Sequence, residues 1–251
     1  MRAGRVVAPL AATVLAVAFW WGATAAWNIK PFFVPAPPDI VAAFRRDPGY
    51  LLSELGSTMA STAAGFALAA VGGVLLAVVL TTSRTVERAI LPLLIAVNAI
   101  PKVAVAPLLV VWLGFGREPK IVLVVLISFF PIVLASAAGL TSTPIELTEL
   151  ARSMDASFWQ SYLRLRLPWA LPQIFVGLKV AVSLAVIGAV VAEISNPDTG
   201  LGAVVVLSST SADTPLAFAA IILLAALSVS LFYAISAVER LVIPWAREIA
   251  G

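Results

Sequence analysis

Cysteine and histidine are both absent from this chain of 251 residues. Without cysteine it holds no disulfide and no thiolate metal site, and without histidine it lacks the commonest metal ligand and the commonest general base. No glycine is directly followed by lysine, so the phosphate-binding loop G-x-x-x-x-G-K-[ST] is missing as well. These absences predict a protein with no catalytic residues, no metal site and no cofactor-binding or P-loop ATP site of its own.

Charged residues are also scarce, at 12% of the chain, whereas 61% of the residues are hydrophobic. A soluble domain carries about 25% charged residues, so this composition is that of a membrane protein. The net charge of +3 is scattered along the chain, and no basic run is suited to nucleic acid. We therefore expect a lipid bilayer, and not nucleic acid, around this protein.

Six apolar stretches are long enough, at about 20 residues, to cross a bilayer as helices. They cover residues 6–27, 58–81, 89–113, 121–140, 171–193 and 215–237. The sequence thus predicts an all-α polytopic membrane protein with a single transmembrane domain over residues 1–251. The first stretch is similar to a secretory signal, but its uncharged run is longer than a signal core and ends in aromatic residues, so we expect a retained span.

Lysine and arginine are unequally divided between the segments that join these spans. With the N-terminus inside, the inside segments hold Arg2, Arg5, Arg84, Arg88, Arg152, Arg164, Arg166, Arg240 and Arg247. The outside segments hold Lys30, Arg45, Arg46, Arg117 and Lys120. Because basic residues favour the cytoplasmic side, this excess predicts a multi-pass protein with both termini in the cytoplasm.

The longest polar segment between two spans covers about residues 141–170 and includes Glu146, Glu149, Arg152, Asp155, Arg164 and Arg166. Unpaired charges are costly in hydrocarbon, so this segment must face water, on the cytoplasmic side. Residues 146–153 are predicted to form a short amphipathic helix whose apolar face holds Ile145, Leu147, Leu150 and Met154. The segment is interpreted as a docking surface.

The second half of this polar segment predicts another short helix. Asp155 either adopts a turn conformation or caps that helix, which runs through Phe158, Trp159, Tyr162 and Leu165. Leu167 and Pro168 are expected to end the helix and to direct the chain into the membrane.

The third span is unusual because Pro92, Pro101 and Pro107 interrupt it and Asn98 and Lys102 lie within it. Proline leaves a helical carbonyl without its donor, which is tolerable only where protein or water satisfies that carbonyl. A lysine in a span is costly unless it faces a cavity, pairs with an acidic side chain or snorkels to the surface. For Lys102 we favour an aqueous pathway and keep the other two alternatives open.

Four further features of the sequence give structural expectations. Lys179 lies near the cytoplasmic end of its span and is expected to snorkel. Glu193 either lines the outer mouth of a pathway or contacts a delivery protein, or else is a solvated helix end. Asn98, Lys102 and Glu193 are thus candidate pathway residues.

Asp39 is expected to cap a surface helix whose Ile40, Val41 and Phe44 share one face, and Asp213 begins the last span. Small residues at helical spacing, Gly65, Ala69 and Gly73 in one span and Gly177, Ala181 and Ala185 in another, favour packing within one bundle over a dimer seam.

The polar segment also resembles a known signature, which reads Glu-Ala-Ala, three residues, Gly, nine residues, Ile, one residue, Leu-Pro. Here it appears as Glu149-Leu150-Ala151, Asp155 in place of Gly, Leu165 in place of Ile, and Leu167-Pro168. The signature marks the cytoplasmic coupling loop of permease subunits in bacterial binding-protein-dependent ABC importers. PAPPDIV, AIPKVAVAPLLVVWLGFG, SFFPIVLASAAGL, VVAEISNPDTGLG and ERLVIPW are similar to the nitrate, sulfonate and taurine branch of that family, over roughly residues 31–246.

The resemblance implies the fold of a type I ABC importer permease in the bacterial cytoplasmic membrane. It implies three kinds of partner: a second and commonly identical permease subunit, two cytoplasmic ATPases that bind ATP and Mg²⁺, and an extracytoplasmic solute-binding protein. Contact with the ATPase is implied for Glu149, Leu150, Ala151, Met154, Asp155, Leu165, Leu167 and Pro168. Asp155 departs from the family glycine, so it adds a charge to that contact and makes a left-handed turn costlier.

The function implied is import of a small, anionic or organic solute of the nitrate, sulfonate or taurine type by alternating access. The same machinery carrying a vitamin precursor, a flavin or an aromatic acid is the alternative within transport. An ion-coupled secondary transporter is the alternative from another class, but it predicts inverted repeats and membrane carboxylates, and neither is evident. A membrane enzyme would need a cluster of bases at one depth, which the scattered carboxylates do not supply.

Overall fold

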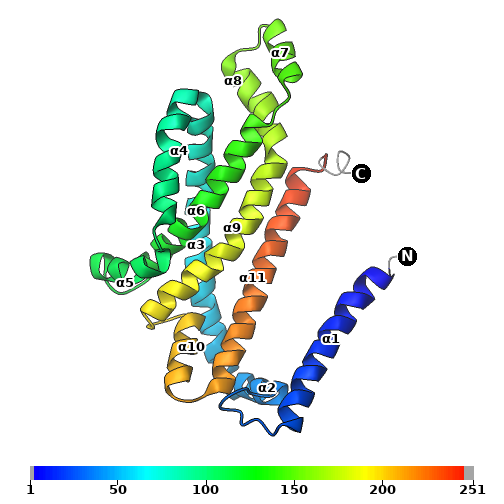
Figure 1. Cartoon of the computed structure of the whole chain (residues 1–251), viewed down its shortest axis with the longest axis vertical. Helices are drawn as coiled ribbons and strands as arrows, with labels where there is room; N and C mark the ends of the chain where they lie inside the picture. The colour runs from blue at the N-terminus through cyan, green and yellow to red at the C-terminus, as the bar shows by residue number, and fades with distance from the viewer. Residues whose placement is uncertain (1–2, 246–251) are drawn as a thin grey trace.

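The computed structural model describes residues 3–245, with the side chains of 3–10, 152 and 158 excepted, and all secondary structure in this part of the chain is helical (Figure 1). Arg2 and Arg247, which entered the prediction of orientation, lie outside the described residues. The long helices are α1 (Ala3–Ala26), α3 (Pro48–Thr82), α4 (Arg84–Ala99), α5 (Lys102–Leu113), α6 (Glu118–Thr141), α9 (Leu167–Ser195) and α11 (Thr214–Val242). The short ones are α2 (Pro37–Arg46), α7 (Ile145–Ser153), α8 (Phe158–Ser161), the π-helical turn η1 (Tyr162–Arg166) and α10 (Leu201–Thr210).

Four of the predicted spans are confirmed as helices that are long and apolar enough to cross a membrane. They are α3, α6, the continuous helix Trp159–Ser195 and α11. Helix α3 begins ten residues before the predicted 58–81, because the carboxylate of Asp47 accepts a hydrogen bond from the Tyr50 amide at 2.9 Å and Pro48 fits the first turn. At 1.5 Å per residue its 35 residues extend about 50 Å, well beyond a hydrocarbon core of about 30 Å.

The predicted third span, 89–113, is wrong as a single helix. Helices α4 and α5 meet at an angle of 88° and together make at most a fifth crossing. The cause is Pro101, which has no amide hydrogen and holds the preceding Ile100 in an extended conformation (φ −66°, ψ 127°). The first predicted span is helical as α1, but its described apolar part, Ala11–Ala26, is shorter than the 18 residues of a candidate span. Among the described residues, four or five segments are therefore able to cross a membrane, whereas six were expected.

The core of the bundle is formed by α3, α6 and α9, which cross one another where small residues allow close approach. A methyl group on Gly65 would lie 2.6 Å from Val124 of α6, and one on Gly177 would lie 2.5 Å from Ala135. Ala69, Ala181 and Ala185 are fully buried in the same core. The small residues thus pack within one bundle, as predicted.

At the end of the molecule away from α7 and α8, the short helices α2 and α10 pack against α11 (Figure 1). Ile40 and Ala43 face this contact, whereas Val41 is 50% exposed, so the predicted shared face was wrong for Val41. Helix α10 was not predicted and lies in what the sequence suggested was an outer loop. Helix α11 begins as expected, since Asp213 accepts a hydrogen bond from the Leu216 amide at 3.3 Å.

Candidate functional site

Helices α7 and α8 project together from one end of the bundle (Figure 1). The amphipathic helix predicted for 146–153 is confirmed as α7. Its apolar residues are not covered, since Ile145 is 66%, Leu150 57% and Met154 74% exposed. Glu149 and Asp155 are also exposed, whereas Leu147 and Ala151 are half-buried. The projecting segment, residues 145–166, therefore presents a mixed apolar and charged surface, and we call it the coupling segment.

Asp155 ends α7 in the left-handed conformation, with a φ of +53°. The Ala156 amide donates to the Ala151 carbonyl oxygen at 3.0 Å, which closes the turn as in a Schellman motif. Of the two alternatives for Asp155, the turn conformation is the one observed. The next helix is capped instead by Ser157 and Gln160, whose side chains accept each other's amide hydrogens at 3.2 Å and 2.8 Å.

The expectation that Leu167 and Pro168 end the second helix was wrong, because the helix runs without interruption from Trp159 to Ser195. Between α8 and α9 the chain forms the π-helical turn η1, and the Leu167 amide donates to the Tyr162 carbonyl oxygen. Pro168 has no amide hydrogen to donate, and the wider turn accommodates its ring within the helix. Leu165, Leu167 and Pro168 are half-buried in this passage.

Tyr162 fixes the coupling segment to the bundle. Its side chain is 2% exposed and packs among Ala77, Leu140 and Ile174. Its hydroxyl oxygen lies 2.7 Å from Oγ1 of Thr81 near the end of α3. By contrast Trp159, on the preceding turn, is 63% exposed. Tyr162 therefore joins the coupling segment to α3 through Thr81 and to the buried residues of α6 and α9.

The elbow between α4 and α5 contains two of the candidate pathway residues. Lys102 Nζ donates to Oδ1 of Asn98 at 2.6 Å and also to its main-chain oxygen. Both residues line a cavity of about 530 Å³ between the elbow and α6. Within the described residues no acidic side chain pairs with Lys102, so that alternative is not observed. Lys179 does form an ion pair, with Glu239 of α11 at 2.9 Å, in place of the expected snorkelling.

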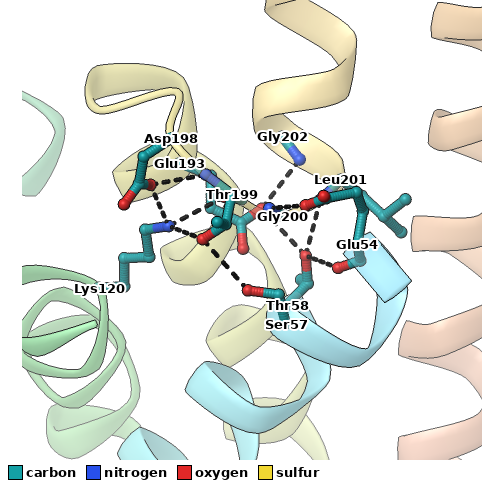
Figure 2. Close-up of polar contacts among 10 residues, drawn as sticks. All are labelled: Glu54, Ser57, Thr58, Lys120, Glu193, Asp198, Thr199, Gly200, Leu201 and Gly202. Carbon is teal, nitrogen blue, oxygen red and sulfur yellow. Dashed lines mark hydrogen bonds and ion pairs between the residues drawn. The ribbon is translucent and has the colours of Figure 1, made fainter. Parts of the chain in front are cut away.

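Glu193, the third candidate pathway residue, is completely buried, so the expectation of a solvated helix end was wrong (Figure 2). Its Oε2 accepts hydrogen bonds from the Thr58 hydroxyl at 3.1 Å and from the Gly202 amide at 2.8 Å. Because it is 0% exposed, it borders no open pathway in this structure. Its contacts join α9 to α3 and to the start of α10.

The start of α10 is surrounded by acceptors from α3 and α9, which satisfy its free amides (Figure 2). The Gly200 amide donates to Glu54, and the Leu201 amide donates to Thr58 Oγ1 at 2.9 Å. Carboxylates are favoured here because the first turn of a helix has unpaired amides and a positive dipole end. This arrangement holds α10 against the bundle.

Lys120 is the residue that the sequence reasoning missed. It was counted only as one of the basic residues of the outside segments, yet its side chain is 1% exposed and needs a partner. Its ammonium group donates to Asp198 at 2.6 Å and to Oγ1 and the carbonyl oxygen of Thr199 at 2.8 Å and 2.9 Å. The two partners are 78 residues apart, and no local spacing signals such a pair. The polar stretch 196–200 between apolar segments was the one indication that a partner was needed there.

With this geometry in view, comparison with known proteins decides the family. Residues 69–244 match the family model of the binding-protein-dependent transport system inner membrane component. The chain belongs to this family. It is a multi-pass permease component of the inner membrane rather than an enzyme, and the resemblance found in its coupling-loop signature is confirmed.

Relatives of this permease match along nearly the whole chain. The formylaminopyrimidine transport permease of Halalkalibacterium halodurans is 36% identical over 91% of this chain and 92% of its own length. The riboflavin transport system permease of Chloroflexus aurantiacus is 34% identical over 92% of this chain and 87% of its own. The taurine transport system permease of Escherichia coli is 27% identical over 92% of this chain and 86% of its own length. The branch named by the resemblance is therefore present among the relatives, at lower identity than the formylaminopyrimidine and riboflavin permeases.

Proposed function

We propose that this permease forms, with a second and identical subunit, the membrane channel of an ATP-driven importer that works by alternating access. Two separate ATPases bind ATP and Mg²⁺ and press on the coupling segments, and a soluble protein delivers the solute at the opposite face. The observation that carries the proposal is the coupling segment itself. It projects from the bundle, leaves Leu150 and Met154 exposed, and is joined rigidly to α3 and α9 by Tyr162.

The proposed ATPase contact includes the whole set named from the signature. Glu149, Leu150, Met154 and Asp155 supply the exposed surface. The other members of the set are half-buried and are proposed to support that surface: Ala151, Leu165, Leu167 and Pro168. An exposed apolar patch bordered by charge is typical of a protein interface, and here the partner is the ATPase.

The proposed orientation places both termini and the coupling segment in the cytoplasm. The N-terminal end of α1 and the C-terminal end of α11 point toward the end of the molecule that carries α7 and α8 (Figure 1). The excess of lysine and arginine on the segments at this end supports the cytoplasmic side. The delivery protein then meets the end that holds α2 and α10.

For the solute we propose a small heteroaromatic compound such as a vitamin precursor or a flavin. The relatives named for formylaminopyrimidine and riboflavin transport are 36% and 34% identical to this chain, and the one named for taurine transport is 27% identical. A small anion of the sulfonate, taurine or nitrate type is the second candidate. Asn98 and Lys102 are proposed to line the path of the solute, since both border the cavity at the elbow.

Copurification with the cognate ATPase tests the coupling role. The variants Glu149→Arg and Ala151→Trp should lose the ATPase, because one reverses a charge of the proposed interface and the other places a bulky ring on its half-buried base. Glu118→Arg is the matched control, since Glu118 is exposed at the opposite end of α6. It should retain the ATPase.

Retention of the ATPase by both coupling-segment variants would contradict the proposed docking surface. If the wild-type permease bound no ATPase at all and took up solute in response to an ion gradient, the secondary transporter would replace the importer. Each variant should first be shown by size-exclusion chromatography to be folded as well as the wild type.

A further inference from the structure

The cavity at the α4–α5 elbow has a composition that the coupling role does not explain. It has a volume of about 530 Å³, within the range of about 300–1,000 Å³ in which proteins bind small molecules. Apart from Asn98 and Lys102, the side chains that line it are apolar, and Phe129 and Phe130 of α6 contribute aromatic rings. It is a half-open apolar cavity with one cationic corner.

The cationic corner has donor capacity to spare. A lysine ammonium group has three hydrogens, and in Lys102 two of them are directed to the side-chain and main-chain oxygens of Asn98. One hydrogen is therefore available to an acceptor in the cavity. The contact with Asn98 also holds the ammonium group in place, so little conformational entropy is lost when that acceptor binds.

The bend that creates the cavity would be costly in lipid. Helices α4 and α5 are separated at Ile100 and Pro101 and turn by 88°, which leaves carbonyl groups at the end of α4 without helical donors. Irregular backbone at membrane depth is tolerated where it is buried in protein or lines a cavity. The Lys102 ammonium satisfies one of these carbonyls, that of Asn98, so the same side chain both stabilises the bend and faces the cavity.

We infer that this cavity holds the solute during its passage and selects a planar heteroaromatic compound with an acceptor or anionic group at its edge. The inference rests on the proposed function and names the residues that select the solute. The rings of Phe129 and Phe130 offer faces and edges to an aromatic system, and Lys102 receives its acceptor. A compact sulfonate or oxyanion needs several polar donors around it, and this lining supplies few.

The test is ATP-driven uptake into proteoliposomes that contain the permease with its ATPase and its solute-binding protein. The probes are formylaminopyrimidine, riboflavin and taurine, each radiolabelled. Val97→Trp fills the cavity, whereas Val71→Trp on α3 is the matched control, since it makes the same change at a similarly exposed residue that does not line this cavity. Val97→Trp should lower uptake of the aromatic probe at least about tenfold, and the control should stay within about twofold of wild type.

A second variant tests the cationic corner without filling space. Lys102→Met keeps an unbranched side chain, one atom shorter, and removes the ammonium donors, so uptake of the aromatic probe should fall about tenfold. Lys30→Met, at an exposed lysine outside the bundle, should have no such effect. Both Lys102→Met and Val97→Trp should still copurify with the ATPase, because the elbow lies away from the coupling segment.

The outcomes distinguish a failure of the cavity inference from a failure of the proposed importer function. If an aromatic probe is imported and both elbow variants behave like their controls, the cavity inference is overturned while the proposed function stands. If the wild type imports taurine and neither aromatic compound, the inferred solute class is overturned. The cavity could instead hold a lipid. If lipid copurified with the wild type and was lost in Val97→Trp while uptake stayed unchanged, the inference would also be overturned. If the wild type binds no ATPase and shows no ATP-driven uptake, the proposed function itself fails.

Discussion

Lys120 Nζ lies 2.6 Å from Oδ1 of Asp198 and thereby ties the first turn of α6 to the loop between α9 and α10 (Figure 2). The lysine side chain is 1% exposed and that of the aspartate 36%, so the pair is buried at one end and hydrated at the other. Around it, Glu54, Thr58 and Glu193 hold the first amides of α10. This polar cluster fixes the bundle at the end opposite the coupling segment.

Loss of this ion pair should destabilise the permease. Lys120→Met removes the ammonium donor to Asp198 and to the Thr199 carbonyl oxygen, so that Asp198 keeps the hydrogen bond from the Thr199 amide at 2.7 Å. We expect a loss of about 2–3 kcal/mol of unfolding free energy. That is less than for a fully buried pair, because water reaches Asp198. Unfolding in a double-mutant cycle with Asp198→Asn measures the coupling, and Lys30→Met is the control. A coupling energy near zero would show that the pair has no stabilising role.

Gly200 is expected to be intolerant of any side chain. Its φ is +101°, and a methyl group there would lie 2.1 Å from Oε1 of Glu193. Gly200→Ala should therefore cost more than about 2 kcal/mol through backbone strain and steric clash. Gly56→Ala is the matched control, since Gly56 is in helix α3 with open space around it, and there alanine should stabilise by about 0.5–1 kcal/mol. Thermal unfolding of the purified protein compares the two, and equal midpoints would refute the expectation.

Asp155 separates the effects of conformation and charge at the coupling segment. Its φ of +53° is accessible to glycine and asparagine at low cost but costly for a β-branched residue. Asp155→Gly and Asp155→Asn should keep ATPase binding, whereas Asp155→Val should weaken it about tenfold or more, since a strain of about 1–2 kcal/mol distorts the turn. Titration of the ATPase against the reconstituted permease gives the affinities. If asparagine were as harmful as valine, the carboxylate charge would be what matters.

Tyr162 should be needed for transmission rather than for docking. Tyr162→Phe removes the hydroxyl that lies 2.7 Å from Thr81 while it keeps the buried ring, at a cost of about 1 kcal/mol. We expect the variant to bind the ATPase normally but to import less solute for each ATP hydrolysed. Measuring hydrolysis and uptake on the same proteoliposomes tests this, with Leu163→Ala as the control, since Leu163 is 55% exposed on the same turn. An unchanged ratio would mean that the hydroxyl contact carries no part of the coupling.

Features that depend on neighbouring residues were predictable from the sequence. Apolar length located α3, α6, α9 and α11, because a membrane span must bury about 20 residues whatever surrounds it. Periodicity located α7, and the aspartate and proline before α11 located its start. The left-handed turn at Asp155 was one of two predicted alternatives, since only a few residue types tolerate that conformation.

Features that depend on distant residues were decided only by the tertiary structure. Three prolines predicted an interruption of the third span, but only the structure shows that the break lies at Pro101 and that α5 turns by 88° to pack on α6. Pro168 predicted a helix end, yet the π-helical turn just before it allows the helix to continue through the proline. The buried states of Lys120 and Glu193 come from partners 78 and 135 residues away. Hydropathy places a residue in or out of the membrane, whereas only the packed bundle decides which charge meets which, because a buried charge is stable only beside a partner that the fold supplies.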